Sequence, residues 1–255
     1  MNNKKEVRKM FFNKSNKDEI VDEVLSNDAF TNLKLDLIDI DLKLETGDKF
    51  EVHYEGPFDE KPTVEAKADT LKIKEPRVDR KHGKFWKKGF IEVNIMNQND
   101  SGNLVITVPK NCQLGTVNAS LVSGDTTIKN LKATALSGFT VSGDVNFESV
   151  KADEFKLTTT SGDIDLDKVE VKQGKAKLTS GDFTIKNSQV FDEFKVSTTS
   201  GNNIVENVKV AQYQLSTLSG DNSLFGKNGA SAKVGNDSDN SNFILNTLSG
   251  DNTVR

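Results

Sequence analysis

The chain has 255 residues, of which 35% are hydrophobic and 28% are charged, and its formal net charge is −4. This composition is typical of a globular protein, and the slightly acidic balance gives no overall attraction to nucleic acid, so no nucleic-acid partner is expected. One cysteine and two histidines cannot supply an intramolecular disulfide or a zinc site, so we expect neither a metal nor a cofactor.

Residues 1–27 are expected to form a helical or flexible N-terminal segment. The apolar run near the start is too short for a secretory signal, and no stretch of about 18 apolar residues could span a membrane. Ile20, Val21, Val24 and Leu25 would share one stripe of a helix, which predicts a short helix over residues 17–27. We expect this helix to cover the first strands, with docking to a partner or a membrane surface as the alternative. Localisation stays open between the cytoplasm and the cell envelope.

Residues 28–110 predict an irregular, all-β region, the N-terminal part of a solenoid. The alternation that runs through Leu33 and Leu35 to Leu37 changes phase at Ile38, so a bulge or a corner is predicted near Leu37 and Ile38. Further alternating runs, separated by Gly, Pro and Asp turn signals, occupy residues 50–54, 71–73, 91–95 and 104–108.

Residues 111–255 carry a tripeptide repeat. Ser-Gly-Asp or Ser-Gly-Asn begins at Ser123, Ser142, Ser161, Ser180, Ser200, Ser219 and Ser249, at intervals of 19, 19, 19, 20, 19 and 30 residues. Apolar residues recur at fixed offsets from each serine with period 2, which indicates stacked β-coils rather than helical repeats. The repeat predicts a parallel β-solenoid with 19-20-residue coils about 4.8 Å apart, wound with a right-handed sense. The long interval predicts a loop insertion at about 226–240.

The triplets predict a ladder of identical corners. Glycine supplies a backbone conformation that other residues resist, and the Asp or Asn side chain can bond to neighbouring backbone groups. The predicted ladder consists of Gly124, Asp125, Gly143, Asp144, Gly162, Asp163, Gly181, Asp182, Gly201, Asn202, Gly220, Asp221, Gly250 and Asp251. A calcium ladder is the alternative, although calcium-binding β-repeats recur every nine residues and supply ligands from both sides.

The outward columns of the coils predict solvated faces. Lys129, Glu148 and Lys186 belong to one column of mixed charge, in which neighbouring coils can form weak ion pairs. Asp163, Asp165 and Asp167 point outward on one strand and resemble the paired carboxylates of polysaccharide-acting β-helix enzymes. No histidine, arginine or tyrosine recurs beside them, so no catalytic residue is assigned and an enzyme is not expected.

The segment from Arg77 to Phe90 holds six basic residues and one acidic residue, a local charge of +5. Cations interleaved with aromatic side chains suit an anionic interface such as a phospholipid headgroup layer or a wall polymer. The alternative is a hairpin loop whose tryptophan packs onto the sheet. The candidate binding residues are Arg80, Lys81, Lys84, Phe85, Trp86, Lys87 and Lys88.

The order of these motifs resembles a known family. The stretch L-D-L-I-D-I-D-L-K-L-E-T-G-D-K-F-E-V-H-Y-E-G, then P-T-V-E-A-K-A-D-T-L-K-I-K, G-N-L-V-I-T-V-P-K and the serial S-G-D coils are similar to the bacterial "putative adhesin" family, a β-solenoid domain of unknown function, over about residues 28–255. Some members are associated with Lia-type envelope-stress systems of Gram-positive bacteria. The resemblance implies a non-enzymatic, envelope-associated protein with no established catalytic residues.

Two functions follow as expectations. The first is an envelope binding module that presents loops on a rigid rod, with an anionic envelope component or an envelope protein as its partner. The second is a cytoplasmic scaffold for protein interactions, and a polysaccharide-acting enzyme is a distant third. Val254 lies within a coil, so we also expect an open sheet edge there that could pair with a second copy.

Overall fold

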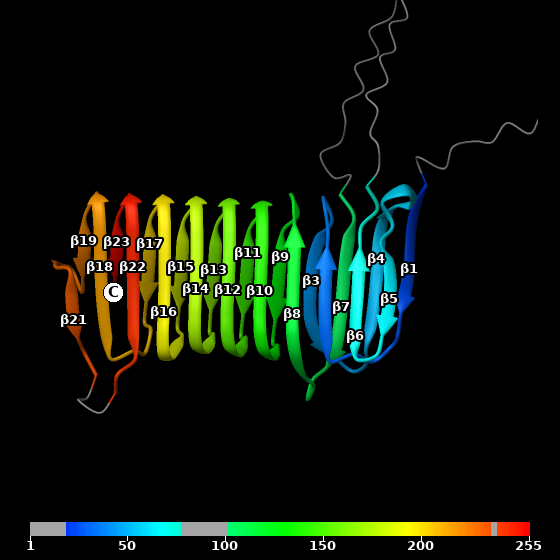
Figure 1. Cartoon of the computed structure of the whole chain (residues 1–255), viewed down its shortest axis with the longest axis horizontal. Helices are drawn as coiled ribbons and strands as arrows, with labels where there is room; N and C mark the ends of the chain where they lie inside the picture. Colours follow the sequence, from blue (N-terminus) through cyan, green and yellow to red (C-terminus); the bar gives the residue numbers. More distant parts are fainter. Residues whose placement is uncertain (1–18, 78–100, 236–238) are drawn as a thin grey trace, which may run out of the picture.

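The computed structural model describes residues 19–77, 101–235 and 239–255, which form a rod of two long sheets packed face to face (Figure 1). The 12-stranded sheet A consists of β1 (Ile20–Ser26), β3 (Asp41–Gly47), β4 (Glu51–Pro57), β7 (Asn103–Pro109), β9 (Thr126–Lys129), β11 (Val145–Glu148), β13 (Ile164–Asp167), β15 (Phe183–Lys186), β17 (Asn203–Glu206), β19 (Asn222–Leu224), β20 (Lys227–Asn228) and β23 (Asn252–Val254). The 11-stranded sheet B consists of β2 (Asn32–Asp36), β5 (Thr63–Lys67), β6 (Thr70–Lys74), β8 (Gln113–Leu121), β10 (Lys132–Ser142), β12 (Lys151–Ser161), β14 (Glu170–Ser180), β16 (Gln189–Ser200), β18 (Gln212–Ser219), β21 (Ser231–Lys233) and β22 (Asn242–Ser249).

Each regular coil has a long strand in sheet B, a Ser-Gly-Asp corner and a short strand in sheet A. Successive long strands are parallel and in register, so that Ser142 pairs with Ser161, Ser161 with Ser180 and Ser180 with Ser200. Equivalent residues of neighbouring coils therefore lie one β-spacing apart, about 4.8 Å. The predicted parallel β-solenoid is confirmed.

The core lies between the two sheets. It is filled by the inward side chains of the strands, which recur at every second residue and stack in columns from coil to coil. In one such column Phe194, Phe243 and Tyr213 stack, with ring centroids 5.2 and 6.3 Å apart. Gly174 precedes Phe194 in this column, and a Cβ there would lie 2.1 Å from the Phe194 ring, so the glycine makes room for the aromatic stack. Apolar packing along the rod is thus continuous from coil to coil.

The phase change at Leu37 and Ile38 is a corner, as predicted. β2 belongs to sheet B and β3 to sheet A, and the chain bends between Asp36 and Asp41 to pass from one to the other. Leu37 is buried at this corner, while Ile38 is only half-buried. The change of alternation in the sequence therefore marks a change of sheet.

The coils at the start of the chain do not stack in chain order. β2 lies between β6 and β8, and β3 lies between β7 and β9. The second coil, made by β6 and β7, is therefore the outer one, and the first coil is enclosed on both sides.

The same inversion occurs at the other end of the rod. β22 pairs with β16 on one side and with β18 on the other, and β23 lies between β17 and β19 (Figure 1). The coil of the seventh triplet thus lies between the coils of the fifth and sixth triplets. The expectation of an open edge at Val254 is wrong, because β23 has a hydrogen-bonded partner on each side.

Short antiparallel strands cover the outer coils. The chain between the sixth and seventh coils forms β20, which pairs with β19, and β21, which pairs with β18. At the opposite end β5 pairs with β6 in the same manner, and β4 pairs with β7. In its described part, the predicted insertion at about 226–240 therefore caps the rod through β20 and β21 rather than forming a simple protruding loop.

The predicted N-terminal helix is wrong over its described part. Residues Ile20–Ser26 form β1, an antiparallel partner of β4. Val21 and Leu25 pack against the core, whereas Ile20 is 64% exposed, as a period of 2 requires. The β-branched residues and the free backbone edge of β4 favour a strand at this position. Among the described residues no helix is long or apolar enough to cross a membrane.

Candidate functional site

The glycines of the triplets stand where no side chain fits. A Cβ on Gly143 would lie 2.2 Å from the carbonyl oxygen of Gly124, and one on Gly181 would lie 2.1 Å from that of Gly162. Gly181 also has a φ of +138°, which side chains disfavour. Both the close stacking of backbones and, at Gly181, the dihedral angle therefore require glycine.

The third residues of the triplets form a continuous hydrogen-bonded ladder. The backbone N–H of Asp144 donates to Asp125 Oδ1 at 2.9 Å, and that of Asp163 donates to Asp144 Oδ1 at 2.8 Å. The ladder continues through Asn202 to the inserted coil, where the Asp251 N–H donates to Asn202 Oδ1 at 3.0 Å. Each carboxylate thus holds the corner of the next coil.

Asp41 is a member of this ladder that the triplet search missed. The Asp125 N–H donates to Asp41 Oδ1 at 2.9 Å, so Asp41 holds the first regular corner although no Ser-Gly precedes it. Asp41 lies 84 residues before Asp125, and the coil between them in the sequence is the outer one, so the coil length does not reveal this register. In the described part of the chain no three His, Cys, Asp or Glu residues converge as metal ligands.

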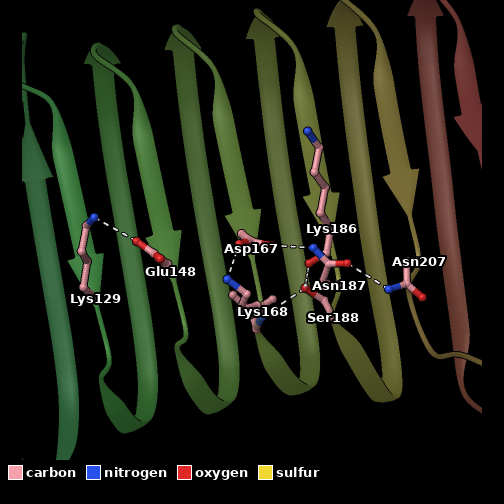
Figure 2. A network of polar contacts seen from close by, with 9 residues as sticks. Lys129, Glu148, Asp167, Lys168, Lys186, Asn187, Ser188 and Asn207 are labelled. Atoms are coloured by element: carbon pink, nitrogen blue, oxygen red, sulfur yellow. Dashed lines mark hydrogen bonds and ion pairs between the residues drawn. The ribbon is translucent and has the colours of Figure 1, made fainter.

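A second corner ladder, also missed, follows the short strands of sheet A. Its non-glycine residues have positive φ, namely Asn130, Ser149, Lys168, Asn187 and Asn207. Asn207 Nδ2 donates to Asn187 Oδ1 at 2.9 Å, so the amides also link coils (Figure 2). Asparagine tolerates this conformation better than most residues. Its recurrence five residues after the triplet aspartate is the signal that sequence reasoning overlooked.

The outer face of sheet A is compensated in charge, as predicted. Lys129 Nζ lies 2.9 Å from Glu148 Oε2 on the next coil (Figure 2). This contact raises the pKa of Lys129 and lowers that of Glu148. Asn187 and Lys168 hold Asp167 and lower its pKa. These ion pairs are exposed and contribute little to stability.

The three outward carboxylates of β13 and its corner have different contacts, namely those of Asp163, Asp165 and Asp167. Asp163 belongs to the corner ladder, because its Oδ1 accepts the N–H of Asp182 at 2.7 Å. Burial raises the pKa of Asp165, and the nearby Asp163 carboxylate raises it further. Asp167 is held by its neighbours in the polar network of Figure 2. Two of the three carboxylates therefore serve the coil contacts, which is a structural role.

The basic, aromatic candidates lie outside the described residues, namely Arg80, Lys81, Lys84, Phe85, Trp86, Lys87 and Lys88. The described residues that flank them are fixed on the rod. The Glu75 N–H donates to the carbonyl oxygen of Asp36 at 2.9 Å, and the Asp41 N–H donates to that of Gly102 at 2.9 Å. These two flanks therefore lie at the corner edge of the outer coil, beside the triplet ladder.

Glu75 is a buried carboxylate at the base of this insertion. Its Oε2 accepts the N–H of Ile38 at 2.6 Å and that of Asp39 at 3.1 Å, and a third N–H from Ile40 lies 3.4 Å away. Burial raises the pKa of Glu75, although these three donors lower it in part. The side chain completes the corner of the neighbouring coil, which has no Ser-Gly-Asp triplet.

The outer face of sheet B carries a further feature that sequence reasoning missed. Lys156, Lys175 and Lys195 are directly opposite one another on β12, β14 and β16. All three lie five residues before the triplet serine, so the column could have been found from the repeat. Phe139 is 44% exposed on the same face.

Comparison with known proteins places this rod in a family. The Toastrack DUF4097 family matches residues 30–255. No curated protein shows significant similarity to the chain. This family match confirms the resemblance to a bacterial β-solenoid domain of unknown function.

Solved structures also resemble the chain. A "putative adhesin" from Bacteroides fragilis is 14% identical, with 93% of this chain and 98% of that chain covered and a TM-score of 0.49. A "putative cell adhesion protein" from Clostridium sporogenes is 12% identical, with 92% and 98% covered and a TM-score of 0.40. A "putative lipid binding protein" from Parabacteroides distasonis is 12% identical, with 92% and 97% covered and a TM-score of 0.39. From the match over residues 30–255, the chain belongs to the Toastrack DUF4097 family.

Proposed function

We propose that this protein is a non-enzymatic binding module of the bacterial cell envelope. In this proposal a rigid solenoid presents the basic, aromatic segment of residues 77–90 to an anionic envelope component, either lipid headgroups or a wall polymer. The link to envelope stress that the sequence resemblance implies belongs to the same proposal.

The observation that carries the proposal is the position of the insertion between β6 and β7. Both of its flanks are hydrogen-bonded to the neighbouring coil, at Asp36 and Asp41. A segment anchored at two points on a rigid scaffold is a common position for binding residues. The local charge of +5 and the single tryptophan of the chain are concentrated there.

The chemistry of the segment supports an anionic ligand. Lysine and arginine side chains attract phosphate or carboxylate groups, while tryptophan favours the boundary between polar headgroups and an apolar layer. The remainder of the chain is net acidic, so this attraction is local rather than general.

A scaffold for protein interactions is the second candidate. β1 is the outermost strand of sheet A among the described residues, and its Ile20 and Val24 side chains are 64% and 45% exposed. An edge strand with apolar side chains can add a strand from a protein partner. Fractionation of cells separates the two candidates, since the module would be found with the envelope and the scaffold with the cytoplasm.

Sedimentation with envelope material tests the binding proposal. The wild type, a variant with Trp86→Ala, Lys87→Ala and Lys88→Ala, and a control with Lys129→Ala on sheet A are mixed with wall fragments and with vesicles that contain phosphatidylglycerol. We expect the triple variant to lose most of the binding, and the control to keep it. Equal sedimentation of all three proteins would overturn the proposal.

A further inference from the structure

The outer face of sheet B carries a narrow strip in which positive charge predominates. Seven lysines and one aspartate occupy two adjacent outward columns that run along the rod. We call this set the lysine strip: Lys72, Lys34, Lys156, Lys175 and Lys195 in one column, and Lys74, Asp36 and Lys177 in the other. Lys74 lies 3.6 Å from Asp36, and the other lysines have no ion pair in the part of the chain that the structure describes.

Stability does not account for this arrangement. Lys156, Lys175 and Lys195 are directly opposite one another on parallel strands, where like charges destabilise a sheet. The outer face of sheet A avoids this cost by ion pairs such as Lys129 with Glu148. Unpaired lysines stacked on a sheet are instead suited to a ligand that brings negative charge to them.

A shallow groove interrupts the strip between Lys34 and Lys156. Its volume is about 360 Å³, within the range of ligand sites. Small polar side chains, Asn118 and Ser137, lie between the two lysines, and the exposed ring of Phe139 stands beside them. Hydroxyl and amide groups beside an exposed aromatic ring favour a ligand with both hydroxyl groups and an apolar face.

We propose that the lysine strip and its groove bind a linear anionic polysaccharide that runs along the rod axis, across the strands of sheet B. A pyranose ring would stack on Phe139 and bond to Asn118 and Ser137. Its acidic groups would meet Lys34 on one side and Lys156, Lys175 and Lys195 on the other. The proposal rests on the proposed envelope function for the origin of the ligand, but it names a separate site.

The repeat of the rod suits such a polymer. Lys156, Lys175 and Lys195 follow one another at one β-spacing, about 4.8 Å. A pyranose polymer advances by a similar length per sugar, so consecutive acidic sugars can remain in register with consecutive coils. A rigid scaffold with a matching repeat binds such a polymer without first having to order itself.

The borders of the strip favour a narrow polymer over a flat lipid layer. Glu154 and Glu193 are exposed on one side of the lysine columns, and the exposed Asp163 and the half-buried Asp182 lie at the corner on the other side. A flat anionic surface would press against both rows of carboxylates and be repelled. A single polymer chain contacts only the lysines between them.

Binding to defined polymers tests the inference. The probes are oligogalacturonate, which is an acidic pyranose oligomer, inorganic polyphosphate, neutral dextran and vesicles that contain phosphatidylglycerol. The variants are a strip double, Lys156→Gln with Lys175→Gln, and Phe139→Thr, which resembles the Thr158 that follows it in the column. The matched control is Lys129→Gln with Lys186→Gln on sheet A. Circular dichroism and thermal melting confirm that each variant is folded.

We expect the wild type to bind oligogalacturonate and not dextran. The strip double should weaken this binding roughly ten-fold, because two charged contacts are lost, while the control double changes it less than about two-fold. Phe139→Thr should weaken oligogalacturonate binding about five-fold and leave any polyphosphate binding unchanged, since only a sugar offers a face to the ring.

Three results would overturn the inference: equal losses in the strip and control doubles, no oligogalacturonate binding by the wild type, or binding only to vesicles. The outcome is distinguishable from that of the envelope proposal. If the Trp86, Lys87 and Lys88 variant loses envelope sedimentation but the strip double still binds oligogalacturonate as the wild type does, the envelope proposal is supported and the polysaccharide inference is overturned. Oligogalacturonate binding through the strip without any envelope sedimentation would do the reverse.

Discussion

At the scale of single residues, the glycine of each triplet is the position least tolerant of change. In Gly181→Ala the new Cβ would lie 2.1 Å from the Gly162 carbonyl oxygen, at a φ of +138°. The backbone at Gly162 cannot move aside without disturbing the coils on both sides. We therefore expect a loss of about 2–4 kcal/mol in the free energy of unfolding, which urea denaturation measures.

A glycine in open surroundings provides the control for this substitution. The nearest atom to a Cβ at Gly229 is a methyl group of Leu224 at 3.5 Å, and its φ is not positive. Gly229→Ala should therefore change the free energy of unfolding by less than about 1 kcal/mol. Similar effects of the two substitutions would contradict the stacking explanation.

The raised pKa of Glu75 predicts that the free energy of unfolding depends on pH. Its pKa is raised above the ordinary value of 4.5 in the folded protein, mainly by burial. The folded state therefore holds this proton more tightly than the unfolded state, so the stability that it contributes is fully present below pH 4.5. That contribution is lost as pH rises through the raised pKa.

Glu75→Gln should remove this part of the pH dependence, because the amide does not titrate and its oxygen can still accept the N–H groups of residues 38–40. Urea denaturation of wild type and variant between about pH 4 and pH 7 measures the difference. If the free energy of unfolding of Glu75→Gln changes with pH as steeply as that of the wild type, another group is responsible for the pH dependence. Glu75→Ala, which leaves three donors without an acceptor, should cost about 2–3 kcal/mol at any pH in this range.

At the scale of elements, the second corner offers a stabilising substitution. Lys168 has a φ of +54° where the equivalent residues of the next coils are Asn187 and Asn207. Lys168→Asn should raise the free energy of unfolding by about 0.5–1 kcal/mol, because asparagine tolerates this conformation better. Thermal melting measures the gain, and Lys186→Asn, at a strand position, serves as the control that should not stabilise.

Three asparagines, of which Asn203 and Asn252 are buried and Asn222 is half-buried, specify where the inserted strand β23 lies. Asn203 Nδ2 donates to Asn252 Oδ1 at 2.7 Å, and Asn252 Nδ2 donates to Asn222 Oδ1 at 2.8 Å. The chain of amides follows the spatial order of β17, β23 and β19, which differs from their order in the sequence. Equivalent inward positions on other coils carry apolar residues such as Val145 and Ile164.

Asn252→Leu should cost about 2–5 kcal/mol, because it leaves the amides of the buried Asn203 and the half-buried Asn222 without their partner. Replacement of all three asparagines by valine should cost less, since only the Thr198 hydroxyl and the Ser216 carbonyl oxygen, which bond to Asn203 and Asn252, then lose a partner. Urea denaturation compares the two variants. A triple variant as unstable as the single one would contradict this explanation.

The regular elements could be predicted from the sequence because each coil repeats the same local chemistry. The triplet fixes one corner, and the period-2 alternation fixes which side chains face the core. Residues 20–26 misled the prediction, since Ile20, Val21, Val24 and Leu25 fit a helical stripe as well as a strand. The free edge of β4 decides between the two, and an edge is a property of the folded sheet rather than of the segment.

At the scale of the whole molecule, the order of coils could not be predicted from spacing. The interval of 30 residues before the seventh triplet indicates an insertion, but parallel pairing of β22 with β18 would satisfy the same register on either face of the sixth coil. Only the contacts of Asn252 and the pairing with β16 distinguish the two arrangements. The lysine strip was missed for a related reason, because its charge is visible only when the coils are aligned.

The two ends of sheet B predict that copies of the protein do not pair through this sheet. The outer strands of sheet B among the described residues are the short strands β5 and β21, and strands this short offer little backbone for pairing. Light scattering at increasing concentration should give a constant mass near 28.0 kDa. A mass that doubles with concentration would indicate that copies associate through these ends or through another face.

The enclosed position of β22 and β23 has a consequence for biosynthesis. The ribosome completes β18 and β19 before the strands that will separate them from β16 and β17 exist. The middle coils can be added one after another as the nascent chain emerges, but this end of the rod cannot reach its final arrangement until residue 254 has left the exit tunnel. Vectorial growth therefore stops one step short of the finished protein, because β18 and β19 pair with the rod only through β22 and β23, which are made after them.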